Sequence, residues 1–400
     1  MQLILGYMEK SHDWISKIKG FMRLKIYLLL LCTQVVGCTH FKKLYNDFGV
    51  DKQLKEYSAH YPPIRIYFDR WGAIYPQYTV QHKLFQDNCS VLERVYTHVS
   101  ELKSAFEAEG IPYKEDASAK DNFELLQRRL VENYIAKINQ AATDKELVFL
   151  IHGYNNTAET AFRSLEKLRV TVAKRFPATH FQFVEIYWDG LHNEGRWVNS
   201  LRIWDNAQYS AARVGLGLRR ILSGIKHTHN YVVTHSHGAG VITEALFNVR
   251  RFKEKFYHSD PDGKIINMLQ ERFDTPKTQF VIGMLAPAIP GTNVFDEYAC
   301  RTVDGRNQKV QLKNYRFING FNKYDHVTSK WKFAGIWGAT TLACREKEHR
   351  AVSQLFHGDQ SIYNRVNFSE DRHRKQTSHV LPSYIDNPRF SDFIDQVFHE

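Results

Sequence analysis

The chain has 400 residues, of which 43% are hydrophobic, 24% charged and 14% aromatic. This balance excludes a disordered, collagen-like or low-complexity protein, because there is enough apolar material for a large core. The formal net charge of +11 permits contact with anionic lipid or nucleic acid, but no basic stripe is interleaved with aromatic residues. The sequence therefore indicates a globular protein and argues against a nucleic-acid partner.

Residues 1–37 contain the parts of an export signal in order. Arg23 and Lys25 give a positive start, a short apolar run follows, and small residues lead to Cys38. The run is shorter than the ~20 residues that a membrane-spanning helix needs. The stretch from Val35 to Cys38 resembles the lipobox of bacterial lipoproteins, which implies cleavage before Cys38 and an acyl anchor on it. The alternative is an uncleaved leader, or a buried apolar segment with a chance cysteine.

The same resemblance implies a location in the bacterial cell envelope, with the membrane as a partner through the lipid on Cys38. Thr39 follows the cysteine, where an Asp would favour retention at the inner membrane in some bacteria. The outer membrane is therefore favoured. Two acidic residues precede the basic start, which is unusual for an export signal, so translation is expected to begin at Met22 or Met8.

The five cysteines agree with export without proving it. One would be lost with the signal and one lipidated, which leaves three and at most one internal disulfide. No two cysteines are spaced as C-x-x-C, which argues against a zinc ribbon or a thioredoxin-type site. The three that remain, whose pairing the sequence leaves open, are Cys89, Cys300 and Cys344.

The chain after the leader is expected to form one large domain on a tether. Its strand and helix patterns alternate, which indicates an α/β fold with a mostly parallel sheet covered by helices on both faces. The continuous apolar run at 146–151 is typical of a strand buried on both faces. The expected segments are the tether at 38–62, the domain at 63–400, its N-terminal strands and helices at 63–145, its core at 146–400, and elaborations at 253–277 and 330–375.

In chain order, the period-2 and apolar runs predict strands, and the 3.6-residue patterns predict helices. The expected strands cover 64–68, 73–80, 146–151, 181–188, 231–234, 280–285 and 315–319. The expected helices cover 84–110, 121–141, 158–175, 206–224 and 239–252, with a last amphipathic helix from about residue 390.

The strand expected at 231–234 ends in the motif Thr-His-Ser-His-Gly-Ala-Gly, and a helix-like segment follows. A serine in a strand-to-helix turn, with small residues after it, is typical of a nucleophile elbow, which lifts the hydroxyl above the sheet. Gly238 and Gly240 fit this crowded turn, whereas Thr234 replaces the usual first glycine of G-x-S-x-G. The motif indicates Ser236 as a nucleophile, with the rings of His235 and His237 lining the turn.

A second motif, Phe149-Leu-Ile-His-Gly-Tyr-Asn-Asn156, ends an earlier buried strand. A His-Gly loop after such a strand can present backbone N–H groups to a developing oxyanion. The predicted donors are the N–H groups of Tyr154 and His237, and one such donor is typically worth ~10²–10³ in rate. His152 is expected to be a structural hydrogen-bonding residue and not a base.

With both motifs in this order, the chain resembles the α/β-hydrolase superfamily, and within it a group of esterase-like bacterial serine hydrolases with an H-G-[FY]-N segment. The resemblance is strongest over 146–252. It implies the α/β-hydrolase fold and the chain order nucleophile, acid, base.

That order points to an acid in the loop after the strand at 315–319, where Asp325 lies, with Asp296 as the main substitute. The base is expected near the C-terminus at His379, with His357 and His373 as alternatives. His379 would take the proton of Ser236, and Asp325 would hold its tautomer.

The predicted function is hydrolysis of carboxylic esters, including lipid esters given the anchoring, by the triad Ser236, His379 and Asp325 through an acyl-enzyme. No metal or organic cofactor is implied. The alternatives are a non-catalytic binding protein of the same fold in the envelope, and an acyltransferase. Expected pocket walls are Tyr154, Trp188 and Phe321.

Two other site classes are disfavoured. The segment from Val233 to His237 also resembles the start of the zinc motif of metallo-β-lactamase-like hydrolases, because His-x-His after a strand points two imidazoles to one side. The next ligands would fall at 239 and 240, which are Ala and Gly, and the pair His227 and His229 has no carboxylate at a matching spacing. A dinucleotide site is disfavoured because the glycines at 215 and 217 lack a third.

Overall fold

The computed structural model describes residues 62–76, 99–190, 192, 197–247, 278–291, 301–303, 306–308, 314–329, 340–369 and 377–398. The predicted leader, Cys38, almost all of the tether and the elaboration at 253–277 lie outside these ranges. So do Asp296, His373, Cys89 and Cys300. Within the described ranges, no helix combines the length and the apolar character needed to cross a membrane.

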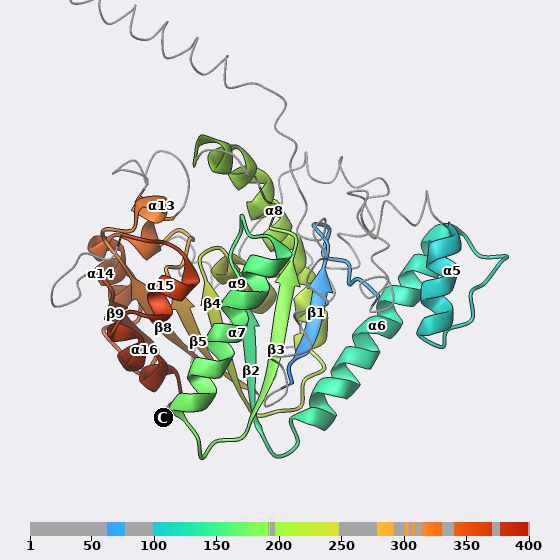
Figure 1. The fold of residues 1–400 in the computed structure, drawn as a ribbon, viewed down its shortest axis with the longest axis horizontal. Helices are drawn as coiled ribbons and strands as arrows, with labels where there is room; N and C mark the ends of the chain where they lie inside the picture. Colours follow the sequence, from blue (N-terminus) through green and yellow to red (C-terminus); the bar gives the residue numbers. More distant parts are fainter. Residues whose placement is uncertain are drawn as a thin grey trace, which may run out of the picture.

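A seven-stranded sheet forms the centre of the molecule (Figure 1). Its strand order is β1-β3-β2-β4-β5-β8-β9, and every neighbouring pair is parallel. The carboxyl ends of all seven strands therefore share one edge, and β4 lies in the middle. The strands are β1 (Ile64–Phe68), β2 (Glu146–Ile151), β3 (Phe181–Trp188), β4 (His229–His235), β5 (Gln279–Leu285), β8 (Tyr315–Phe321) and β9 (Tyr363–Asn367).

Helices cover both faces of the sheet, which is the α/β class expected from the sequence. Helices α7 (Ala158–Arg175), α15 (Leu381–Ile385) and α16 (Arg389–Phe398) lie on one face; α8 (Trp197–Leu222) and α9 (Gly238–Phe247) lie on the other (Figure 1). The remaining elements are α5 (Val99–Ala108), α6 (Ala119–Ala141), the hairpin β6 (Arg301–Val303) and β7 (Arg306–Gln308), α13 (His326–Ser329), a 3₁₀ turn (Thr341–Ala343) and α14 (Glu346–Leu355).

The core explains why the apolar runs form the inner strands. All eight residues of β3 are buried, and so are five of the six in β2, because helices cover both sides of them. Gly215 lets α8 approach α9 closely, since a Cβ there would lie 2.6 Å from the Cβ of Glu244 and 2.7 Å from the carbonyl of Val241. This glycine therefore serves helix packing.

Four elements differ from the sequence expectation by more than a few residues. Helix α8 begins at Trp197, well before residue 206, because its first turns carry apolar residues that the sequence pattern assigned to a loop. Strand β9 belongs to the central sheet, although 330–375 was expected as an elaboration; it has only two apolar residues, so no run announces it. In the segment expected as a strand at 73–80, Ile74 makes an isolated bridge with Phe68, and residues 77–80 lie outside the described ranges. Helix α5 begins at Val99, and the earlier part of the helix expected at 84–110 also lies outside them.

Candidate active site

Ser236 occupies the turn between the carboxyl end of β4 and the start of α9. Its φ of 54° is in the left-handed region, which non-glycine residues rarely adopt and which is concentrated at functional sites. The turn is held by hydrogen bonds from the Ser236 N–H to Leu285 O (2.9 Å) and from the Ala288 N–H to Ser236 O (3.0 Å). A Cβ on Gly238 would lie 2.6 Å from the carbonyl of His152, so only glycine fits there. Thr234, in place of the usual glycine, is accommodated inside β4.

Of the three predicted triad residues, His379 lies within hydrogen-bond distance of both of the others. The Nε2 of His379 is 2.8 Å from the Oγ of Ser236, and its Nδ1 is 2.6 Å from the Oδ2 of Asp325. Ser236 is 2% exposed, Asp325 is fully buried and the side chain of His379 is 13% exposed, so the imidazole is the part of the series that faces outward. These residues come from the ends of β4 and β8 and from the segment before α15, far apart in the chain.

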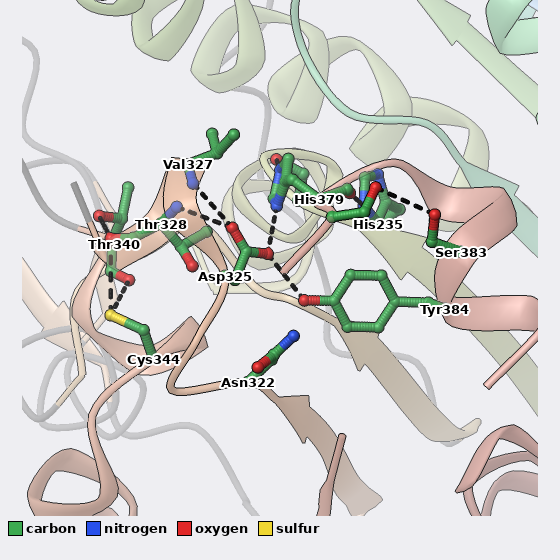
Figure 2. Close-up of polar contacts among 12 residues, drawn as sticks. His235, Asn322, Asp325, Val327, Thr328, Thr340, Cys344, His379, Ser383 and Tyr384 are labelled. Atoms are coloured by element: carbon green, nitrogen blue, oxygen red, sulfur yellow. Dashed lines mark hydrogen bonds and ion pairs between the residues drawn. The ribbon is translucent and has the colours of Figure 1, made fainter. Parts of the chain in front are cut away.

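The carboxylate of Asp325 is held by four donors, as Figure 2 shows. Oδ1 accepts from the backbone N–H groups of Val327 (2.9 Å) and Thr328 (3.1 Å), and Oδ2 accepts from His379 and from the hydroxyl of Tyr384 (2.7 Å). Burial alone would raise the pKa of Asp325, but the interaction with His379 and these hydrogen bonds lower it to about 2. Asp325 is therefore ionised at neutral pH.

The loop after β2 lies directly against Ser236. A Cβ on Gly153 would lie 2.8 Å from the Cβ of Ser236. The carbonyl of Gly153 accepts from the Nδ1 of His152 (2.7 Å) and from the side-chain amide of Asn156 (2.9 Å). In a trans peptide the C=O and the following N–H point in opposite directions, so the Tyr154 N–H points away from these two side chains.

The same reasoning applies to the peptide between Ser236 and His237. The Ser236 carbonyl accepts from the N–H groups of Ala239 (3.3 Å) and Ala288 (3.0 Å), so the His237 N–H points to the opposite side of that peptide. Both N–H groups predicted as oxyanion donors therefore belong to peptide units whose carbonyls are fixed by the protein.

His152 has the contacts of a structural residue. Its Nε2 accepts from the Trp188 N–H (3.0 Å), its carbonyl accepts from the indole N–H of Trp188 (2.8 Å), and the two rings stack at 5.7 Å. Burial lowers the pKa of His152 to about 4, so it stays neutral near pH 7. Trp188 thus holds His152, in the loop after β2, through two hydrogen bonds and ring stacking.

The rings of Tyr154 and His237 share a neighbour that the sequence analysis missed. Trp204, in α8, makes an edge contact with Tyr154 at 4.8 Å and a tilted contact with His237 at 4.7 Å. It was missed because the helix was expected to begin after it. Phe321 was expected in the pocket wall, but its ring packs against His349 at 4.6 Å and lies beneath the guanidinium of Arg365.

His235 and Tyr384 make contacts around His379 and Asp325 that the sequence did not predict. The Nε2–H of His235 donates to the backbone carbonyl of His379 (2.7 Å), and the two rings lie 4.9 Å apart. Burial and then the neighbouring His379 lower the pKa of His235 to about 3, so it acts as a neutral donor. Tyr384, in α15, donates to Asp325. Neither contact has a signal in the sequence, because both partners are distant in the chain.

Of the alternative residues, those that the structure describes do not join the site, whereas Asp296 and His373 lie outside the described ranges. His357 is exposed in the turn after α14, and the imidazole of His227 contacts the carbonyl of His229 at the amino end of β4, the edge opposite Ser236. The ring of His237 is hydrogen-bonded to Ala288 O (3.0 Å), while that of His235 contacts His379 O, so the two rings have separate partners.

Among the residues that the structure covers, no group of three His, Cys, Asp or Glu side chains could hold a metal ion. Cys344 is buried, and within the described residues it forms no disulfide.

Together these features define an α/β protein in which a hydrogen-bonded Ser–His–Asp series stands at the carboxyl edge of a parallel sheet. No protein-family model matches the chain, and no curated protein is significantly similar to it.

Proposed function

We propose that the protein is a serine hydrolase of the α/β-hydrolase fold that cleaves carboxylic esters through an acyl-enzyme. The observation that carries this proposal is the pair of distances at His379, 2.8 Å to Ser236 Oγ and 2.6 Å to Asp325 Oδ2. A binding protein without catalysis has no need for a buried carboxylate, an imidazole and a strained serine in this order. The pair of distances therefore favours the enzyme over the binding-only alternative.

The topology supports the finer fold assignment. The nucleophile follows the central strand β4, the acid follows β8, and the base precedes α15, which is the chain order of the α/β-hydrolase superfamily. The elbow geometry at Ser236, with its φ of 54°, agrees with the strained strand-to-helix turn of that fold.

The proton moves along the hydrogen-bonded series. Ionised Asp325 accepts from Nδ1, so a neutral His379 carries its proton there and leaves Nε2 as the base. Nε2 takes the Ser236 proton as Oγ bonds to the ester carbonyl carbon, and the imidazolium then gives that proton to the alkoxide leaving group. A water molecule, deprotonated by the same nitrogen, attacks the acyl carbon; the bond to Oγ then breaks, the imidazolium returns the proton to Oγ, and the acid leaves.

The tetrahedral oxyanion would bind to the N–H groups of Tyr154 and His237. Their peptide carbonyls are anchored on the opposite side, so the donors need no reorganisation when charge develops. Around them, Tyr154 and Trp204 supply aromatic surface, which suits an apolar acyl or alcohol group.

We further propose that the hydrolase is anchored to a membrane of the cell envelope and that its substrates include lipid esters. The lipid anchor on Cys38 stays a prediction, because that residue lies outside the described ranges. An acyltransferase would use the same triad with an alcohol in place of water, and analysis of the products distinguishes the two.

The test is labelling of the full chain, in detergent, with a fluorophosphonate, followed by hydrolysis of p-nitrophenyl esters of increasing acyl length. We expect labelling of the wild type, and loss of labelling and hydrolysis in Ser236→Ala and His379→Ala. Matched controls are Ser361→Ala and His357→Asn, which change exposed residues away from the triad and should label at the wild-type rate. A folded wild type that stays unlabelled, or a Ser236→Ala variant that still labels, would refute the proposal.

A further inference from the structure

The Oδ2 atom of Asp325 accepts two hydrogen bonds, although the triad requires one. His379 Nδ1 lies 2.6 Å from it and the Tyr384 hydroxyl 2.7 Å (Figure 2). The other oxygen already accepts two backbone N–H groups, from Val327 and Thr328. The carboxylate is therefore anchored without Tyr384, and the hydroxyl shares the oxygen that faces His379.

Packing does not account for the hydroxyl. Tyr384 is fully buried, and its ring contacts those of Phe368 (5.3 Å) and His235 (5.9 Å). A phenylalanine would fill the same volume and make the same ring contacts without burying a polar group, which is costly unless the group is paired. The position of the oxygen thus points to a role in the electrostatics of Asp325.

The other ionisable groups around Asp325 do not add a second charge that would alter its interaction with His379. Burial lowers the pKa of His235, on β4, to about 3 and raises the pKa of Tyr154, on the loop after β2, and of Tyr384 itself, so these three stay neutral in the working range. The thiol of Cys344 is directed to the carbonyl of Thr328, and exposed His326 follows Asp325 in the chain.

We propose that Tyr384 is a positioning residue that limits how strongly Asp325 stabilises the protonated form of His379. This inference rests on the proposed function. A hydroxyl that donates to Oδ2 withdraws part of the carboxylate charge from the imidazolium. Attack by Ser236, which requires unprotonated His379, should therefore extend further into the acidic range than in a triad without this donor.

The experiment follows the second-order rate of fluorophosphonate labelling against pH, because the attack of Ser236 on the probe requires unprotonated His379. In Tyr384→Phe we expect the midpoint of the acidic limb to move up by about 0.5–1 pH unit, which is a ~3–10-fold slower labelling on that limb. The plateau at high pH should stay within about threefold of the wild type.

The matched control is Tyr363→Phe. It removes another buried hydroxyl that is hydrogen-bonded to a histidine, His349 Nδ1 at 2.6 Å, but that histidine is outside the triad. Its midpoint should equal that of the wild type, while the melting temperatures of both variants report any loss of stability. If Tyr384→Phe lowers the plateau without moving the midpoint, the hydroxyl is merely structural and the proposal is wrong.

A second variant and a second measurement keep the two proposals separable. Tyr384→3-fluorotyrosine retains the fold and is a stronger donor, so its midpoint should move down; a midpoint that moves up would contradict the inference. The downfield NMR signal of His379 Nδ1–H needs no reactivity, and it should move in Tyr384→Phe but not in Tyr363→Phe. A wild type without labelling would refute the hydrolase, whereas an Nδ1–H signal unchanged in Tyr384→Phe would refute the role of Tyr384 alone.

Discussion

Gly153 provides a sharp test of how tightly the loop after β2 is fitted to Ser236. In Gly153→Ala the new Cβ would lie 2.8 Å from the Cβ of Ser236, 3.2 Å from the carbonyl of His235 and 3.3 Å from its Nδ1. Ordinary contact begins at 3.4 Å, so the loop and the elbow must separate by at least about 0.6 Å at the closest pair. That displacement acts on the 2.8 Å contact between Ser236 and His379.

Misplacement by about 1 Å can cost ~10²-fold in rate, so we expect labelling of Gly153→Ala to slow by roughly 10–100-fold. Overpacking of this kind also costs typically ~1–3 kcal/mol of folding free energy. Urea unfolding measures the second quantity and the fluorophosphonate rate the first.

The control is Gly283→Ala, in β5, where the new Cβ would lie 2.7 Å from Val397 and 2.9 Å from Phe393. The overlap is similar but falls on two side chains of α16 and not on Ser236, so stability should fall without a comparable loss of labelling rate. If Gly153→Ala labels as fast as the wild type while Gly283→Ala is destabilised, the loop is not fitted to Ser236 as described.

Two buried charged groups give the remaining predictions. Burial raises the pKa of Asp69 to about 6, above its unfolded value near 4, so the folded state loses stability as pH rises from about 4 through 6. Asp69→Asn keeps an oxygen for the Trp71 and Ala73 N–H groups, and we expect it to exceed the wild type by up to roughly 3 kcal/mol at pH 7 and to match it below pH 4. Equal unfolding curves at both pH values would refute this. Glu185 accepts from Arg65 (3.0 Å), Arg169 (3.1 Å) and Tyr187 (3.0 Å) while fully buried, so Arg169→Met should cost ~3–5 kcal/mol by chemical denaturation. A loss below about 1 kcal/mol would show that Arg65 and Tyr187 are sufficient to hold Glu185.

The inner strands and their helices were predictable because burial on both faces leaves an unambiguous pattern. The bounds predicted for β2, β3 and α7 agree with the structure. Edge strand β9 was not found, since Tyr363 and Val366 are its two buried residues and no apolar run marks it. Sequence pattern is thus informative where a run or a helical repeat of buried residues marks the element, as in β2 and α7, and not where the buried residues are few, as in β9.

The site divides in the same way. Ser236 and the loop after β2 carry local motifs. The chain order of α/β-hydrolases, which the sequence resembles, pointed to Asp325 and His379 as the acid and the base. In the structure His379 contacts both of the other side chains. Trp204, Tyr384 and the contact of His235 with His379 depend on three-dimensional packing between distant segments, so no spacing in the chain predicts them.

The position of β4 in the middle of the sheet has a consequence for synthesis of the protein. The strands on one side of it, and the loop that lies against Ser236, all precede the nucleophile in the chain, whereas β5, β8 and β9 on its other side all follow it. His379 comes after the last strand, and α16 behind it packs on β5, β8 and β9. A growing chain therefore carries Ser236 long before it carries His379, so under the proposed function Ser236 would gain its base only after the segment before α15 has been made and has folded onto the sheet.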